Sequence, residues 1–312
     1  MVKTIQSISD LLTQISLFYG FILLGYLISR MSRKGKILNK YLNSLLINLL
    51  LPILILYTFL TSASPSFVEV PLFLVIVLAI HLLGPVIIYF RLQRLDIDNQ
   101  TKGSLFICST FNNALFIPLP LVLIFIGPSA VPFVIMCSLT QMILFVTLGS
   151  AMGAAFGGKD AGWKKIAKDA TIFPPFLAII VTLVLIGLNI RLPNDLALIL
   201  SYNSPLTTYL ALVSVGLGVG VRFSLRDIRT ALNVVVVRQL IIPLVIIPIV
   251  LISTLSQIPI QVLILESLMP PAVLTVVYAS GFNLDVEIAS TTVTVGTLLL
   301  LPLIPLIPLI LG

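Results

Sequence analysis

Ten apolar segments, most of them 20 residues or longer, occupy nearly the whole chain and leave no polar stretch long enough for a soluble domain. A helix needs about 20 apolar residues to cross a bilayer core about 30 Å thick. The pattern therefore predicts an all-α polytopic membrane protein with ten transmembrane helices. The predicted segments are 8–29, 37–61, 70–91, 101–126, 129–156, 169–190, 200–221, 231–253, 258–280 and 286–310.

The composition indicates the same environment. Hydrophobic residues make up 59% of the chain and charged residues 9%, with a mean hydropathy of +1.19, whereas about a quarter of the residues of a soluble domain are charged. The first segment lacks a small-residue cleavage site and is too long for a signal-peptide core, so we expect it to remain as a span. We expect a multi-pass protein of the cell membrane.

The basic residues predict the orientation of these spans. Alternate connections carry 15 of the 18 Lys and Arg residues, and by the positive-inside rule such connections are cytoplasmic, which places both termini outside. The ninth connection should also be cytoplasmic but carries only Asp285 and Glu287. No single basic face exists, so no nucleic-acid partner is expected. The 15 residues are Arg30, Arg33, Lys34, Lys36, Lys40, Arg91, Arg94, Lys102, Lys159, Lys164, Lys165, Lys168, Arg222, Arg226 and Arg229.

Prolines recur at a steady offset and indicate two homologous halves. Pro118 and Pro270 are 152 residues apart, and Pro120 and Pro271 are 151 apart. We expect one five-helix repeat in 1–156, a cytoplasmic linker at 157–168 that contains glycines and charges, and a second repeat in 169–312. Five spans are an odd number, so the second repeat enters the membrane inverted.

Each half contains one apolar segment that prolines interrupt, 110–120 in the first half and 266–275 in the second. Proline removes a backbone donor and clashes with the preceding turn, and unwound helix at membrane depth survives only inside protein or beside a water-filled cavity. The N-terminal ends of the resulting half-helices attract a carboxylate. Paired interrupted helices of this kind indicate the substrate site of a secondary transporter.

Motifs in both halves resemble those of the auxin efflux carrier family. The run Asn113–Leu121, N-A-L-F-I-P-L-P-L, is similar to the N-T-x-x-x-G-x-P-L signature of that family's fourth helix, with Ala114 for Thr and Pro118 for Gly. The resemblance covers essentially the whole chain, and the absence of a long central loop is typical of the short prokaryotic branch rather than the plant carriers. Further matching residues are Leu51-Pro52, Arg191–Asn194, Met269–Val273, Ala279 and Leu284–Ser290.

The resemblance implies a fold and an activity. Helices 4 and 9 would cross at their broken points, spans 1, 2, 6 and 7 would form a scaffold and a homodimer surface, and the other spans would move as an elevator. The family transports auxin and malate-like acids, so the implied substrate is a small monocarboxylate or dicarboxylate. The family is related to the bile acid and sodium symporters.

Amide and hydroxyl side chains near the interruptions are the candidate substrate ligands. Asn112 and Asn113 can bond a carboxylate or steady an unwound backbone, and Asn113 aligns with the family's crossover asparagine. Helix–helix hydrogen bonds are the alternative role. The full predicted substrate-binding set is Asn112, Asn113, Pro118, Pro120, Gln141, Pro270, Pro271 and Thr275.

Glu266 is the only acidic residue deep within a predicted span. A charge there is costly, so a retained one indicates function, and we expect Glu266 to bind a coupling proton or sodium ion. The alternative is a structural role, either as a protonated acid or as the partner of Arg238. No other cofactor is expected.

Several further residues receive structural interpretations. The lone His81 fits a hydrogen-bonded imidazole better than a proton relay, and Cys108 and Cys137 indicate neither a disulfide nor a metal site. The glycines of 216–220 predict close helix packing. Pro302, Pro305 and Pro308 must deform the last turns, without a functional interpretation.

No catalytic constellation is present, so an enzyme is not expected. A small organic anion and membrane lipid are the expected partners. Two alternatives remain open from the sequence: a sodium-coupled carrier of the bile-acid type, and a membrane sensor or scaffold that binds a ligand without moving it.

Overall fold

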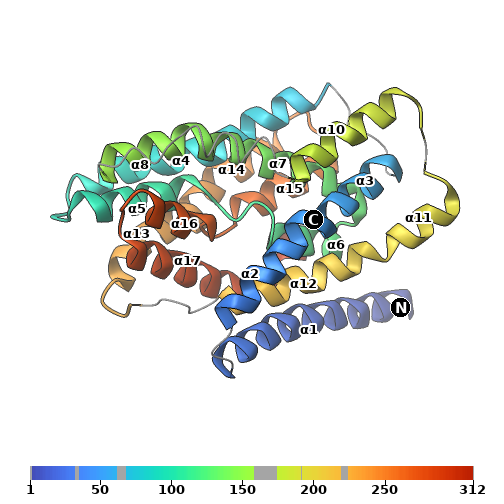
Figure 1. Ribbon diagram of the computed structural model, residues 1–312, viewed down its shortest axis with the longest axis horizontal. Helices are drawn as coiled ribbons and strands as arrows, with labels where there is room; N and C mark the ends of the chain where they lie inside the picture. The colour runs from blue at the N-terminus through green and yellow to red at the C-terminus, as the bar shows by residue number, and fades with distance from the viewer. Residues whose placement is uncertain are drawn as a thin grey trace.

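The computed structural model describes residues 2–31, 35–61, 68–157, 174–190, 192–218 and 224–311. The regular elements among these residues are all helices, with no β-strand, which confirms the predicted all-α class (Figure 1). The α-helices are α1 (Val2–Met31), α2 (Gly35–Leu45), α3 (Leu51–Thr61), α4 (Val70–Leu92), α5 (Asn99–Thr110), α6 (Pro118–Phe125), α7 (Val131–Leu144), α8 (Ser150–Gly157), α10 (Pro174–Gly187), α11 (Asn194–Ser201), α12 (Asn203–Gly218), α13 (Ile228–Val236), α14 (Ile242–Leu251), α15 (Gln257–Ser267), α16 (Leu274–Gly281), α17 (Val286–Leu300) and α18 (Ile307–Leu311).

Six continuous helical stretches in the described ranges are long and apolar enough to cross a membrane. They correspond to six of the ten predicted segments, and two shorter apolar helices, Ile15–Met31 and Leu177–Gly187, overlap the predicted segments 8–29 and 169–190. The remaining two segments, 101–126 and 258–280, are interrupted helices. The six stretches are Ile37–Thr61, Val70–Leu92, Pro128–Gly157, Asn194–Gly218, Ile228–Leu251 and Val286–Leu311.

Three of the long stretches contain a π-helical turn, which widens the helix by one residue and bends it. These turns are η1 (Leu46–Leu50), η3 (Phe145–Gly149) and η4 (Val237–Ile241). The last stretch contains instead a 3₁₀ segment, η5 (Leu301–Leu306), where Pro302 and Pro305 lack the N–H groups that a regular helix needs. The deformation expected at the end of the chain is therefore present.

The helices form two groups that face each other across the interrupted segments (Figure 1). One group contains α1, α2, α3, α10, α11 and α12, which contact one another, and the other contains α4, α5, α6, α7, α8, α13, α14, α15, α16 and α17. Contacts of α12 with α6 and of α3 with α7 join the two groups.

Glycines allow α1 and α12 to pack at close range. A Cβ atom on Gly216 would lie 2.0 Å from the carbonyl oxygen of Ile22, and one on Gly25 would lie 2.1 Å from that of Val213. Next to this contact, the rings of Phe21 and Tyr209 stack with centroids 4.5 Å apart. The structure thus confirms the packing role predicted for Gly216, while Val219 and Gly220 lie outside the described residues.

Two aspartates begin the helices at one end of the second group. Asp98 accepts a hydrogen bond from the backbone N–H of Thr101 at the start of α5, which lowers the pKa of Asp98. Asp285 accepts from the N–H groups of Glu287 and Ile288 at the start of α17. The Thr101 hydroxyl lies within hydrogen-bond distance of both carboxylates. Asp285 is therefore a helix cap, a local reason for an acidic residue in the ninth connection.

The predicted linker 157–168 lies outside the described residues except for Gly157, the last residue of α8. The basic residues assigned to that connection, from Lys159 to Lys168, fall in the same undescribed range.

Candidate functional site

The two interruptions lie side by side and are joined through their backbones. Asn113 donates its N–H to the carbonyl of Pro270 at 2.7 Å, and Ala272 donates to the carbonyl of Phe111 at 2.9 Å. The two segments thus form an antiparallel bridge between Asn112 and Pro271. Buried backbone groups need hydrogen-bond partners. This pairing supplies partners to backbone groups that cannot form helical hydrogen bonds next to the prolines.

Asn113 caps the start of α6. Its Oδ1 accepts hydrogen bonds from the N–H groups of Phe116 at 3.0 Å and Ile117 at 3.3 Å. The donors that we expected to hold a carboxylate at this helix end are therefore engaged by the asparagine itself. Its amide nitrogen makes no hydrogen bond to the described part of the chain, so that nitrogen is the donor left for a ligand.

Thr275 stabilises the start of α16 rather than lining a cavity. Its side chain is fully buried, its hydroxyl donates to the carbonyl of Ala272 at 2.6 Å, and it accepts from the thiol of Cys108 at 3.4 Å. The prolines likewise shape the backbone, because none of Pro118, Pro120, Pro270 and Pro271 lines either of the two cavities next to Asn113.

Asn112 and Glu266 form a buried pair beside the bridge. The amide nitrogen of Asn112 donates to Oε2 of Glu266 at 2.7 Å and to its backbone carbonyl at 3.1 Å. Both side chains are 1% exposed. Glu266 Oε1 and Asn112 Oδ1 have no partner among the described residues. A bound proton or cation would satisfy two such buried oxygens that receive no hydrogen bond.

Arg238 is completely buried in η4 and makes no ion pair with Glu266 in the described structure. Its Nη1 donates to the carbonyl of Ile80 at 2.8 Å, and a carbonyl of Ser109 lies at 3.5 Å. Its Nε and Nη2 have no partner in the described part of the chain. The direct Arg238–Glu266 contact that we considered as an alternative is therefore not formed.

Two cavities lie on either side of Asn113, and Phe116 and Val273 line both. The larger, about 170 Å³, is mostly apolar, and Gln141 contributes a buried amide whose Oε1 lacks a partner among the described residues. Ile47 of η1 and Phe145 of η3 also line this cavity, so two of the π-helical turns contribute to its wall.

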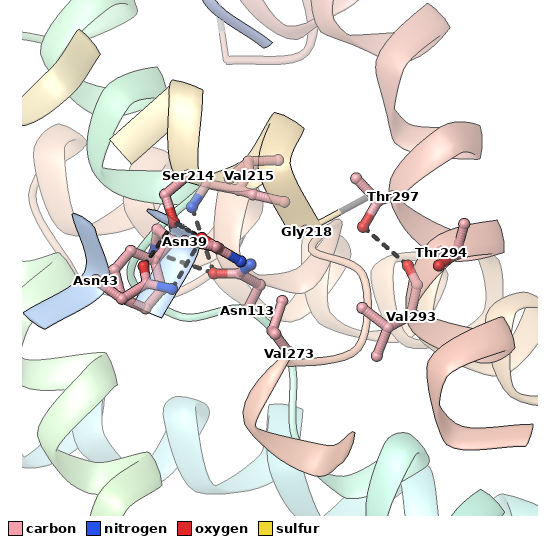
Figure 2. A pocket seen from close by; sticks show the side chains of 12 residues that line it. Asn39, Asn43, Asn113, Ser214, Val215, Gly218, Val273, Val293, Thr294 and Thr297 are labelled. Atoms are coloured by element: carbon pink, nitrogen blue, oxygen red, sulfur yellow. Dashed lines mark hydrogen bonds between the residues drawn. The ribbon is translucent and has the colours of Figure 1, made fainter. Parts of the chain in front are cut away.

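The smaller cavity, about 50 Å³, is lined by apolar side chains together with neutral polar ones (Figure 2). Asn39 and Asn43 of α2 lie beside Ser214 of α12, and the Ser214 hydroxyl is within hydrogen-bond distance of both amide oxygens. Asn113, Thr294 and Thr297 complete the polar lining. A cavity of this size holds a few water molecules or one small polar group.

Comparison with known proteins identifies the family. The family of membrane transport proteins matches residues 12–308. The chain belongs to this family, the auxin efflux carriers. It is 27% identical over 280 residues to an uncharacterized transporter of Methanothermobacter thermautotrophicus, covering 89% of this chain and 91% of that protein. It is 25% identical over 266 residues to an uncharacterized transporter of Methanocaldococcus jannaschii, covering 83% and 85% of the two chains.

The sequence analysis missed the polar residues of the smaller cavity that come from outside the interrupted helices. Asn39, Asn43 and Ser214 were not among the predicted ligands. The available signal was the pair of asparagines four residues apart in an apolar segment, a spacing that places both on one face of a helix. Nothing in the sequence indicated that this face meets α12.

His81 has the role expected of it. It is buried on α4, and its Nδ1 lies 3.0 Å from the carbonyl oxygen of Thr110, to which the Nδ1–H tautomer donates. Cys108 and Cys137 are buried free thiols. No group of three metal-ligating side chains occurs within the described ranges.

Proposed function

We propose that this carrier-family protein is a secondary transporter of small organic anions, either auxin-like monocarboxylates or malate-like dicarboxylates. The observation that carries the proposal is the backbone-paired interruption of two helices, with Asn113 between two cavities. Interrupted helices from the two halves of a transporter characteristically form its substrate site.

The chemistry of the cavities supports an anion with an apolar body. The amide nitrogens of Asn113 and Gln141 are suited to donate to carboxylate oxygens. Phe116, Phe145 and Val273 offer apolar surface to the remainder of the ligand. No lysine or arginine lines either cavity within the described residues, so recognition relies on neutral donors.

We further propose ten spans in two inverted repeats that work as an elevator. The group of α1, α2, α3, α10, α11 and α12 corresponds to predicted spans 1, 2, 6 and 7 and would be the fixed scaffold. The other group, which carries both interruptions, would move. Exposed apolar side chains on α10 and α11, such as Val184 and Leu198, offer the surface for a homodimer.

Glu266 is the proposed coupling group. Its unpartnered Oε1 and the nearby unpartnered Oδ1 of Asn112 support binding of a proton. The same oxygens favour one competing function, a sodium-coupled carrier of the bile-acid type, because hard cations take oxygen ligands. Sodium-dependent uptake would distinguish the two.

Counterflow in proteoliposomes tests transport itself. Vesicles preloaded with an unlabelled organic acid should accumulate the same labelled acid transiently, whereas protein-free vesicles should not. The acid would be chosen by a thermal-shift screen of monocarboxylates and dicarboxylates on the purified protein. A ligand that stabilises the protein but shows no counterflow would indicate a membrane sensor or scaffold instead of a carrier.

A further inference from the structure

A cleft of about 750 Å³ lies between the C-terminal end of α4 and the start of α13, away from the substrate cavities. Arg91, Arg94 and Arg229 line it together with a single acidic residue, Asp96. No ion pair neutralises these arginines within the described structure. The cleft is therefore a concave surface with an excess of positive charge.

The position of the cleft places it at the boundary between lipid and water. At about 1.5 Å per residue, the 23 residues of α4 extend roughly 34 Å, slightly more than a hydrocarbon core of about 30 Å. Arg91 lies in the last turn of this helix. Arg229 is the second residue of α13, and α13 crosses beside α4. Both charges therefore lie at the level of the lipid headgroups.

The rim of the cleft is held in place by hydrogen bonds between the two helices. Arg91 donates from Nε to Oδ1 of Asn233 at 2.9 Å, and the amide nitrogen of Asn233 lies within hydrogen-bond distance of the carbonyls of Arg229 and Thr230. Arg94 and Arg229 are exposed, and their guanidinium groups make no hydrogen bond to the described part of the chain. Two cationic donors are thus available to a ligand.

Apart from Thr230 and Asn233, the rest of the lining is apolar, and part of it faces outward from the bundle. Ile87 and Phe90 of α4 face Leu232 and Val236 of α13 across the cleft, and the side chains of Phe90 and Val236 remain 67% and 44% exposed. A soluble phosphate would leave this surface uncovered. A lipid would bury it under its acyl chains while its phosphate meets the arginines.

We propose that this cleft binds an anionic phospholipid, with the phosphate between Arg94 and Arg229 and the acyl chains against Phe90 and Val236. Arginine donors bind phosphate oxygens with charge-assisted hydrogen bonds, and basic pockets between transmembrane helices at the membrane surface bind lipid headgroups. The site is separate from the substrate cavities, so the proposal stands apart from the transport function.

Lipid binding to the purified full-length protein in detergent tests the proposal. Native mass spectrometry would compare phosphatidylglycerol with phosphatidylcholine of the same acyl chains. The wild type should retain phosphatidylglycerol at least about 10-fold better, and Arg94→Gln/Arg229→Gln should weaken its binding about 10- to 30-fold. Arg30→Gln/Arg226→Gln removes the same charge from exposed arginines outside the cleft and should leave binding unchanged.

Three results would overturn the assignment. The first is equal retention of the two lipids by the wild type, a comparison that needs no variant to fold. The second is an equal loss of binding in the cleft variant and the control variant. The third is displacement of phosphatidylglycerol by glycerol phosphate or inorganic phosphate at comparable concentrations, which would assign the cleft to a soluble phosphate ligand.

Discussion

Asn113 performs two tasks with the two ends of one amide group. Its oxygen caps α6 through Phe116 and Ile117, and its nitrogen faces the cavities without a partner among the described residues. A side chain used in this way fixes the broken helix and presents a donor at the same point. This combination explains why an asparagine suits the position better than a threonine or a serine, which has a single hydroxyl group for both tasks.

Replacing this amide should weaken ligand binding. We expect Asn113→Ala to reduce affinity for an organic anion by about 1–3 kcal/mol, because a charge-assisted hydrogen bond is lost. Loss of the cap should also lower the free energy of unfolding by about 1 kcal/mol. Isothermal titration of purified protein measures the first effect, and Asn48→Ala, at an exposed asparagine outside the cavities, is the control. Unchanged affinity in a folded Asn113→Ala protein would leave Asn113 with the capping role alone.

Glu266 should govern the pH dependence of transport. Glu266→Gln keeps an oxygen that can accept the hydrogen bond from Asn112 but cannot exchange a proton. If a proton on this carboxyl group is obligatory, wild-type uptake varies with external pH, and the variant should show a flat profile while still exchanging substrate. Uptake into proteoliposomes across a pH series measures this. A variant with the full wild-type profile would show that the carboxyl group is structural.

At the scale of helices, close packing depends on where a Cβ atom can be accommodated. Between α1 and α12 the backbones touch at Gly25 and Gly216. Between α4 and α5, a Cβ on Gly84 would lie 1.9 Å from the carbonyl of Ser109. That second contact brings α4, with His81, against the end of α5 just before the interruption.

A single added methyl group should separate α1 from α12. Alanine favours helix over glycine by about 1 kcal/mol, yet Gly216→Ala should lower the melting temperature because its Cβ would lie 2.0 Å from the backbone oxygen of Ile22. Gly20→Ala on α1 is the matched control, since a Cβ there meets nothing within 4 Å, and it should leave the melting temperature unchanged or raise it. Equal melting temperatures for the two variants would contradict the close contact.

At the scale of the whole molecule, the distribution of charge predicts the orientation in the membrane. If the basic connections are cytoplasmic, residue 164 lies on the cytoplasmic side of the membrane and residue 256 on the outer side. A maleimide reagent that does not cross membranes should label Lys164→Cys only from the cytoplasmic side and Ser256→Cys only from the outer side. Cys108 and Cys137 are buried and should give little background. Labelling of both introduced cysteines from one side would contradict ten spans with external termini.

The sequence predicted the helical fold class and the positions of the two interruptions. Apolar segments of sufficient length must satisfy their backbone hydrogen bonds internally, which in a single segment means a helix. The closely spaced prolines Pro118/Pro120 and Pro270/Pro271 mark the two broken helices, whereas the single Pro85 and Pro248 are accommodated inside α4 and α14. Both rules act within about ten residues, so they can be read along the chain without knowledge of its neighbours.

Only the tertiary structure decided what the polar residues at the interruptions do. Asn112 pairs with Glu266 from 154 residues away, Thr275 is packed inside against Cys108, and Asn39 and Asn43 of α2 meet Ser214 of α12. An amide or hydroxyl group uses the same donors and acceptors to cap a helix, to join a buried hydrogen-bond network or to bind a ligand. Which of these it serves depends on the groups that the fold brings opposite it, and those groups lie far away in the sequence.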